Sequence, residues 1–424
     1  GARGRRDEAE ESLRAALTIK GDDVAALRTL GSVLAEKGMD EEAMACLERA
    51  LELDPRDHRS HRRLGAILAR IGREEEAIEA YDHAVVLNPL DFNAWRSKGV
   101  CLAAAGRRDE AIQAFDRALE IEPGDMDSML EKGILLGAAG RAEEAVSVLD
   151  EVIRGRPGDG EALRVRGALL MKRGDPAAAA ADFRAAIEAR PDDPRLWRDT
   201  GVALAEAGRP DEAIACFDAC LDRDPGDARA LRQKGACLCG MGRDEEAVRV
   251  LDRALGLDPE DAQALRTRAV SLTKLGRIPE ALRSLDRALA IRPDDPGILR
   301  LRGVALSEAG RHRAAADSFQ RAVGIDPDDR VSRRHLAISL GRLGDHGAAL
   351  VAMGRVLDAD PGDPIALRGR AAALANLGRH AEALADLDRA VAGDPGDAAA
   401  MLARGEVLER IGRTCMMFTH SSWK

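Results

Sequence analysis

The 424-residue chain has very few aromatic residues, since Phe, Trp and Tyr together make up 2% of it. This leaves too few rings for the stacking platforms that hold single-stranded nucleic acid. The net charge of −10 also disfavours nucleic acid, because binding to phosphates depends on a basic surface. No run of roughly 18 apolar residues is present, so we expect no membrane-spanning helix.

The chain also lacks the short motifs that mark catalytic sites. It has no Gly-rich phosphate loop, no Gly-x-Ser-x-Gly turn and no His-Glu-x-x-His helix. We therefore predict no catalytic residue, no cofactor and no enzyme activity. The seven cysteines have no regular spacing, unlike the disulfide framework of a secreted protein. Because no signal peptide is visible either, we expect a reducing, cytoplasmic setting.

A repeat runs through almost the whole chain. Proline recurs every 34 residues, and Asp lies two residues after each of these prolines. Columns of Leu, Gly and Ala keep the same period, beginning at Leu34, Gly38 and Ala43. A fixed period of this length indicates one small structural unit copied along the chain. The recurring prolines are Pro55, Pro89, Pro123, Pro157, Pro191, Pro225, Pro259, Pro293, Pro327, Pro361 and Pro395.

Each unit is predicted to be two helices joined by a turn. In the unit that starts at Val24, apolar residues spaced by three and four follow the capping Asp23, which is helix periodicity. Gly38 lies where this helix would end, because glycine adopts the left-handed C-terminal cap at little cost. A second helical pattern follows, and Pro55 blocks its continuation because proline lacks an N–H.

This unit is similar to the tetratricopeptide repeat. With position 1 at Val24, small residues stand at positions 8, 20 and 27, Gly at position 15 and Pro at position 32. Position 20 is Ala in all eleven full repeats, whereas position 8 changes from Gly to Ala at Ala269, Ala337 and Ala371. The resemblance covers residues 4–412. It implies an all-α fold, a right-handed α-solenoid (superhelix) of 34-residue helix-turn-helix repeats. The family's aromatic residue at position 11 is Leu here, which predicts a core of smaller side chains.

The repeat phase divides the chain into four segments. Residues 1–23 fit a second helix without its first, residues 24–397 hold eleven tandem tetratricopeptide-like repeats, and residues 398–413 fit the first helix of a further repeat. Residues 414–424 leave the pattern and are predicted to be a non-repeat tail. Because both ends fall inside a repeat, we expect a fragment of a longer array or an interrupted reading of one.

Two groups contain residue types that bind metals. Four thiolates are a zinc ligand set, and four cysteines lie within a short stretch: Cys216, Cys220, Cys237 and Cys239. Cys220, however, stands where other repeats have Ala or Val, and buried Cys packs as a small hydrophobe. His58 and His61 are three residues apart, with no further ligands evident. We therefore predict packing roles and no metal site.

The column that best indicates a binding site is position 5 of the first helix. In tetratricopeptide repeats, positions 2, 5, 9, 12 and 13 line the concave surface where extended ligands lie. The resemblance thus implies that ten arginines face this groove. Arg suits such a role because its planar fork binds carboxylate or phosphate bidentately. They are Arg28, Arg62, Arg96, Arg164, Arg198, Arg232, Arg266, Arg300, Arg334 and Arg368.

A purely structural explanation of this column is also open. A column inherited by duplication would place each Arg against an acidic residue of an adjacent unit, and exposed pairs of that kind contribute about 0–1 kcal/mol. Acidic residues in the same helices include Glu131, Glu161, Asp199, Glu206 and Glu308.

The sequence thus predicts a non-catalytic protein–protein interaction scaffold that binds an extended, acidic peptide segment in its concave groove. The alternative is the substrate-presenting repeat arm of a larger enzyme such as a glycosyltransferase. The family resemblance implies an Asn-lined groove for that arm, whereas this chain has Arg. We expect a protein or peptide partner, with no nucleic acid and no membrane. Whether the chain forms homo-oligomers is left open by the sequence.

Overall fold

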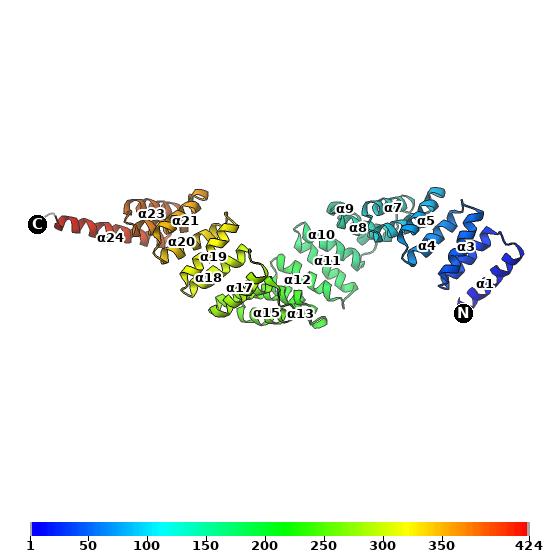
Figure 1. The fold of residues 1–424 in the computed structure, drawn as a ribbon, viewed down its shortest axis with the longest axis horizontal. Helices are drawn as coiled ribbons and strands as arrows, with labels where there is room; N and C mark the ends of the chain where they lie inside the picture. Colours follow the sequence, from blue (N-terminus) through cyan, green and yellow to red (C-terminus); the bar gives the residue numbers. More distant parts are fainter. Residues whose placement is uncertain (1, 422–424) are drawn as a thin grey trace. The chain divides into compact units, whose positions relative to one another are not determined.

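The protein is built from helices alone over the part that the structure describes. The computed structural model describes the backbone of residues 2–421 and the side chains of residues 5–412. The helices, α1 to α24, are joined by short turns (Figure 1). They fall into two compact units, Gly1–Ala207 (unit 1) and Gly208–Lys424 (unit 2). The all-α hairpin architecture predicted from the sequence is confirmed.

The helices alternate between the two roles predicted for each repeat. Even-numbered helices are the first helices of the repeats, and odd-numbered helices are the second. Unit 1 contains α1 (Ala2–Ile19), α2 (Val24–Glu36), α3 (Asp40–Leu53), α4 (His58–Arg70), α5 (Glu74–Leu87), α6 (Phe92–Ala104), α7 (Arg108–Ile121), α8 (Met126–Ala138), α9 (Ala142–Gly155), α10 (Gly160–Lys172), α11 (Pro176–Ala189) and α12 (Pro194–Glu206). Unit 2 contains α13 (Pro210–Arg223), α14 (Ala228–Gly240), α15 (Asp244–Leu257), α16 (Ala262–Lys274), α17 (Ile278–Ile291), α18 (Pro296–Glu308), α19 (His312–Ile325), α20 (Arg330–Arg342), α21 (His346–Ala359), α22 (Pro364–Asn376), α23 (His380–Gly393) and α24 (Ala398–Ser421).

Two kinds of turn separate these helices. Within a repeat, the turn holds a glycine with φ between 71° and 83°, from Gly38 to Gly378. Residues with a side chain are strained at such angles, so the Gly column ends each first helix as predicted. Between repeats, a turn that contains proline leads to an Asp that caps the next first helix. Asp57, for example, accepts a hydrogen bond from the backbone N–H of Arg59 at 3.3 Å.

Small residues allow the two helices of a repeat to pack closely. All alanines of the position-20 column, from Ala43 to Ala383, are buried. Position 8 lies against the large side chain at position 24 of the same repeat. A Cβ added to Gly303 would lie 2.6 Å from the Phe319 ring, which is closer than atoms of neighbouring side chains approach. The small-residue columns are therefore contact points between helices.

First and second helices occupy different sides of each unit. Successive first helices contact one another, from α2 to α10 in unit 1 and from α14 to α24 in unit 2. Within each unit, second helices pack on the first helix of their own repeat and on that of the next. Because the first helices are the more closely spaced, they form the inner side of each stack, and the second helices form the outer side.

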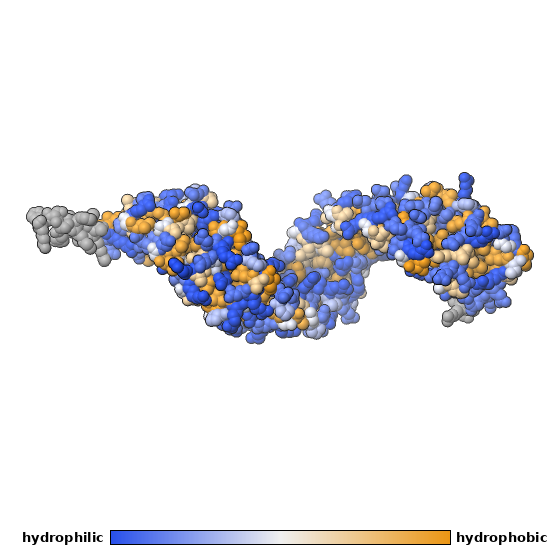
Figure 2. All heavy atoms as spheres, viewed as in Figure 1, coloured by the Kyte–Doolittle hydropathy of each residue, from blue (hydrophilic) through white to orange (hydrophobic). Residues whose placement is uncertain are grey.

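The last helix continues past the repeat pattern. α24 runs through Gly412 without a break, so residues 414–421 of the predicted tail are helical; their side chains and residues 422–424 lie outside the description. The division into half repeats and a tail stays a prediction. Within residues 2–421, no helix combines the length and apolar character needed to cross a bilayer. Figure 2 shows polar residues over much of the visible face, with apolar residues in patches between them.

Candidate functional site

The ten arginines of position 5 all lie on first helices, and so on the inner side of their unit. Unit 1 holds five of them, on α2, α4, α6, α10 and α12, and unit 2 holds the other five, on α14 to α22. Every one is half-buried. Among those with ion pairs, the exposed fraction of the side chain runs from 20% at Arg198 to 39% at Arg96. Each arginine therefore packs its stem and keeps part of its head in solvent.

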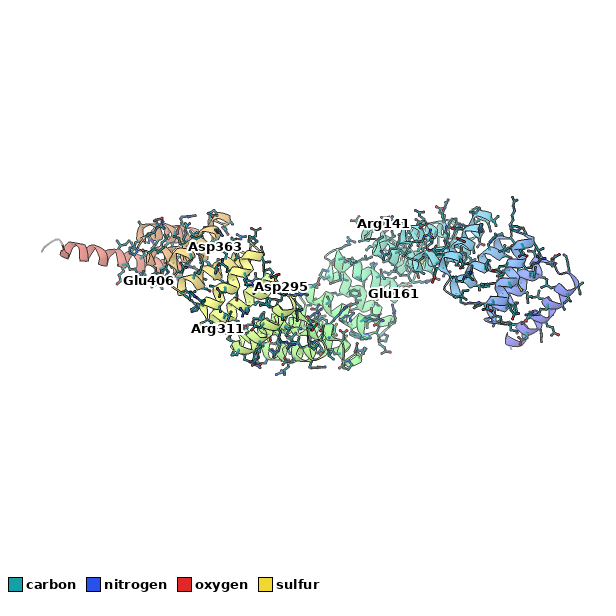
Figure 3. All side chains as sticks on the ribbon, in the orientation of Figure 1. Arg141, Glu161, Asp295, Arg311, Asp363 and Glu406 are labelled. Atoms are coloured by element: carbon teal, nitrogen blue, oxygen red, sulfur yellow. The ribbon has the colours of Figure 1, made fainter. Side chains whose placement is uncertain are left out.

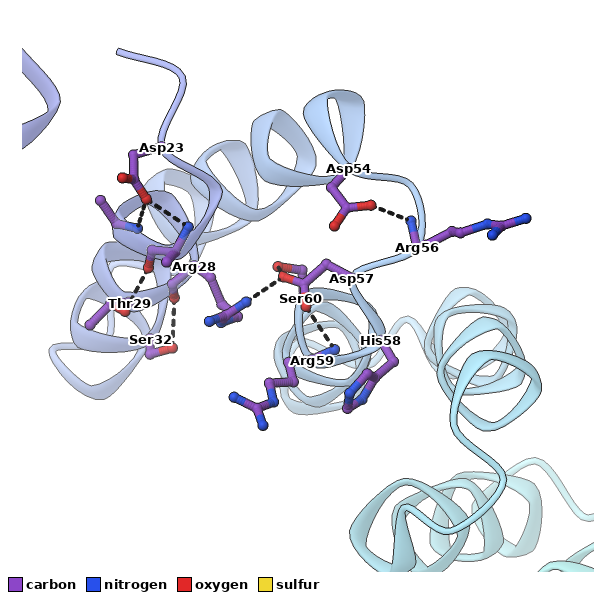
Figure 4. Close-up of polar contacts among 12 residues, drawn as sticks. Asp23, Arg28, Thr29, Ser32, Asp54, Arg56, Asp57, His58, Arg59 and Ser60 are labelled. Carbon is purple, nitrogen blue, oxygen red and sulfur yellow. Dashed lines mark hydrogen bonds and ion pairs between the residues drawn. The ribbon is translucent and has the colours of Figure 1, made fainter. Parts of the chain in front are cut away.

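Most of these arginines bind the Asp that caps the first helix of the next repeat. Arg28 donates from Nη1 to Oδ2 of Asp57 at 2.7 Å (Figure 4). We call this arrangement an Arg–cap pair. The other Arg–cap pairs are Arg62–Asp91 at 3.4 Å, Arg232–Asp261 at 2.9 Å, Arg300–Asp329 at 3.0 Å, Arg334–Asp363 at 3.2 Å (Asp363 is labelled in Figure 3) and Arg368–Asp397.

The cap carboxylate in these pairs has several partners at once. Asp57 accepts hydrogen bonds from the backbone N–H of Arg59, from the Ser60 hydroxyl at 2.7 Å and from Arg28 (Figure 4). Burial by itself raises the pKa of Asp57, but the hydrogen bonds from Ser60 and Arg28 outweigh it and lower that pKa. The carboxylate therefore stays ionised and ties one repeat to the next.

Three arginines of unit 1 have other or additional acidic partners. Arg164 pairs with Glu161 in its own helix, and hydrogen bonds from Arg164 and Arg190 lower the pKa of Glu161 to about 2. Arg198 lies 3.4 Å from Asp199. Arg96 contacts Asp127 at 3.2 Å and also lies 3.9 Å from Asp125, the cap of α8. Of the acidic residues considered from the sequence, Glu161 and Asp199 contact the column.

The main partners of the arginines are the cap aspartates. In the sequence they stand out as the Asp column two residues after each recurring proline, but that pattern alone does not pair them with arginine. Their constant offset of 29 residues from the Arg column, as from Arg28 to Asp57, is the signal that would have found them. An offset of almost one period points to the adjacent repeat, because stacking brings equivalent residues of neighbouring units together.

Arg266 differs from the rest of the column. Among the described residues it makes no ion pair, and the cap residue of the next repeat, Asp295, lies 4.0 Å from Arg292 instead. Gly297 stands beside it: a Cβ built on this glycine would lie 3.6 Å from Nη1 of Arg266. Arg266 is therefore half-buried, next to a residue without a side chain, and free to bind a carboxylate.

Apolar side chains lie exposed among these arginines. At position 9 of their first helices, Val100 and Ile338 are exposed, and at position 2 so are Val331 and Ile365. The inner side therefore presents one guanidinium group on most first helices, with exposed aliphatic side chains between several of them.

The cysteine and histidine groups are placed as packing residues. Cys216, Cys220 and Cys239 are buried, and Cys220 donates from Sγ to Asp227 at 3.7 Å. The ring of His61 stacks on that of His83, with centroids 5.0 Å apart. Over the described part of the chain, no three His, Cys, Asp or Glu side chains come together in a way that would hold a metal ion.

Comparison with known proteins agrees with this architecture. A tetratricopeptide repeat model matches residues 41–89, 75–125, 130–194, 167–228, 266–330, 335–398 and 381–414, and a second such model matches residues 2–62 and 204–270. No curated protein matches the chain significantly.

Solved structures include similar stacks of helices. The APC/C hetero-tetramer Cut9-Hcn1 is 14% identical with a TM-score of 0.47, over 96% of this chain and 94% of that chain. MamA from Desulfovibrio magneticus RS-1 is 25% identical with a TM-score of 0.39, over 40% of this chain and 96% of that chain. These likenesses are too distant to support inferences about function. The repeat models cover most of the sequence, and the chain belongs to the tetratricopeptide repeat family.

Proposed function

We propose that the protein is a scaffold that binds an extended, acidic segment of a partner protein along the inner side of its first helices. Tetratricopeptide repeat proteins are in general protein–protein interaction scaffolds. The observation that carries the finer proposal is the column of half-exposed arginines, which stand at the same position of the first helix in ten repeats. An extended segment advances about 3.3 Å per residue, so its carboxylates meet successive arginines at regular intervals.

The Arg–cap pairs leave the arginine more exposed than its carboxylate. In the Arg300–Asp329 pair, the side chains are 38% and 7% exposed, and in the Arg368–Asp397 pair they are 31% and 7% exposed. In both pairs the carboxylate contact uses Nη1. A ligand approaching the surface therefore meets guanidinium groups that have further N–H donors available, whereas the paired aspartates are less accessible to it.

The same pairs also hold the arginines in place. A guanidinium fixed by its cap carboxylate loses little further freedom when a ligand binds, and this lowers the entropic cost of association. Arg266, which has no such pair and lies beside Gly297, supplies the strongest single anchor in unit 2.

The experiment compares one variant on the inner side of unit 2 with one on its outer side. Arg266→Gln removes the inner anchor without breaking an ion pair, and Arg283→Gln removes an exposed arginine from the outer helix α17. The probes are fluorescent peptides rich in Asp and Glu, and the same peptides with Asn and Gln in their place. We expect the native chain and Arg283→Gln to bind the acidic peptides alike, and Arg266→Gln to bind them several-fold more weakly. Equal binding by both variants, or no preference for the acidic peptides, contradicts the proposal.

A further inference from the structure

A second column of ion pairs closes the junctions between repeats, away from the position-5 arginines. A base at position 7 of a first helix binds an acid at position 25 of the preceding second helix, sixteen residues earlier. Lys98 lies 2.5 Å from Asp82, and Arg302 lies 2.7 Å from Asp286. The other pairs are Lys132–Asp116, Arg166–Asp150, Lys234–Asp218, Arg268–Asp252 and Arg404–Asp388. The long basic side chains cover the seam between successive second helices.

This column is interrupted at several junctions, one of which is where α19 meets α20. Gln320 stands at the acidic position and Leu336 at the basic one. A depression of about 610 Å³ opens there between α19, α20 and α21. Its apolar lining includes Val323, Leu336 and Leu340. We call this depression the outer groove.

Val351 brings a further apolar side chain to the outer groove. It is 59% exposed, at a position that holds Asp317 in the preceding repeat and Arg283 in the one before. The exposed Val351 lines the same depression as the half-buried Leu340 and the buried Leu336, and an exposed apolar side chain beside an apolar depression marks an interaction site.

The edge of the outer groove is basic. Arg355 is exposed and makes no ion pair among the described residues, and Arg333 donates to the carbonyl oxygen of Pro327. The Nε of Arg333 is buried without a hydrogen-bond partner. Residues 311–355 contain eight Arg and five Asp, with no Lys or Glu, although the whole chain carries a net charge of −10. The charged side chains that line the outer groove, Arg333 and Arg355, are both basic.

We propose that the outer groove docks a segment of a partner protein that carries aliphatic side chains flanked by Asp or Glu. The aliphatic groups cover Leu340 and Val351, and the carboxylates pair with Arg333 and Arg355. Charge complementarity selects this occupant, because a basic or neutral apolar segment would leave both guanidinium groups without a partner. The second helices that flank the groove belong to the outer side of unit 2, so this docking is independent of ligand binding at the inner arginines.

The test selects binders from a display library of random short peptides on the purified chain and measures their affinities for four variants. Val351→Glu and Arg355→Gln alter the outer groove at exposed side chains, so neither is expected to unfold the protein. Val86→Glu is the matched control, because Val86 is also an exposed valine, on α5 of unit 1. Arg266→Gln reports on the inner side.

We expect selected peptides to combine aliphatic and acidic residues and to bind about tenfold more weakly to Val351→Glu and Arg355→Gln. Peptides weakened by Val351→Glu should keep native affinity for Val86→Glu and Arg266→Gln, whereas acidic peptides bound at the inner arginines are weakened by Arg266→Gln. The proposal is overturned if no selected peptide is weakened by Val351→Glu, or if the peptides it weakens carry no acidic residues. A dimer in sedimentation experiments that Val351→Glu dissociates also overturns it, because a second copy of the chain would then occupy the outer groove.

Discussion

Arg300 donates from Nη1 to Oδ2 of Asp329 at 3.0 Å, and Asp329 also caps α20 through the backbone N–H of Ser332. A single carboxylate thus begins one repeat and binds the repeat before it. In a repeat protein, stability is approximately the sum of intrinsic repeat terms and interfaces between neighbours. The Arg–cap pair belongs to both terms, since loss of the Asp removes a helix cap and an interface contact together.

Replacing Asp329 with Ala should therefore lower the free energy of unfolding by about 1–2 kcal/mol. Loss of an N-cap costs about 0.5–2 kcal/mol, and loss of a half-exposed ion pair adds little. Asp328→Ala is the control, because this neighbouring carboxylate is exposed and caps no helix. Urea unfolding followed by circular dichroism measures both. A loss of the same size in the two variants would show that the cap geometry does not matter.

Acid should destabilise the protein through these caps. Burial favours a higher pKa for Asp57 and Asp329, but hydrogen bonds from Ser60 and Arg28, and from Ser332 and Arg300, lower both values. The unfolded chain then binds protons more readily than the folded one. The stabilisation is fully present above the unfolded pKa of about 3.9 and is lost as the pH falls through the lower folded values.

We accordingly expect urea midpoints to change little between about pH 7 and pH 5 and to fall below about pH 4. The variant Asp329→Asn should show a shallower decline, because it has one titrating cap fewer. A native chain that becomes more stable on acidification would contradict the lowered pKa values.

Packing at position 20 gives a third prediction. Ala213 is completely buried on α13, whereas Ala215 on the same helix is exposed. Ala213→Leu should cost about 1–3 kcal/mol, because the added methylene and methyl groups force neighbouring helices apart. Ala215→Leu should change stability by less than about 0.5 kcal/mol. Thermal and urea unfolding of both variants test this, and a neutral Ala213→Leu would argue against close helix contact at this column.

The ion pairs at position 7 should differ in strength with the burial of their partners. Arg166 binds both oxygens of Asp182, at 2.6 and 2.8 Å, and Asp182 is buried; Lys98 binds Asp82, which is about half exposed. Hydrogen bonding to Asp182 raises the pKa of Arg166. Arg166→Met should cost about 3 kcal/mol because it leaves a buried carboxylate unpaired, whereas Lys98→Met should cost about 0–1 kcal/mol. Equal losses in urea unfolding would mean that Asp182 finds another partner.

The sequence alone was sufficient to predict the repeat, its two helices and its family. The features that predict them are local: Gly38 ends a helix because of its own φ, Asp57 caps a helix through N–H groups within three residues, and Ala43 lies against Gly31 of the other helix in its hairpin. Because each copy of the repeat has the same local requirements, the residues that meet them recur every 34 positions in the sequence.

Tertiary structure decided which residues of different repeats meet. Stacking of neighbouring hairpins decides that Arg28 binds Asp57, that Arg266 is left without such a partner, and that Val351 is exposed beside an apolar depression. Stacking sets distances between side chains about one period apart, and a hairpin's own sequence does not contain those distances. The sequence therefore determined the repeating unit and its order, whereas packing between units determined which surfaces remain available to a partner.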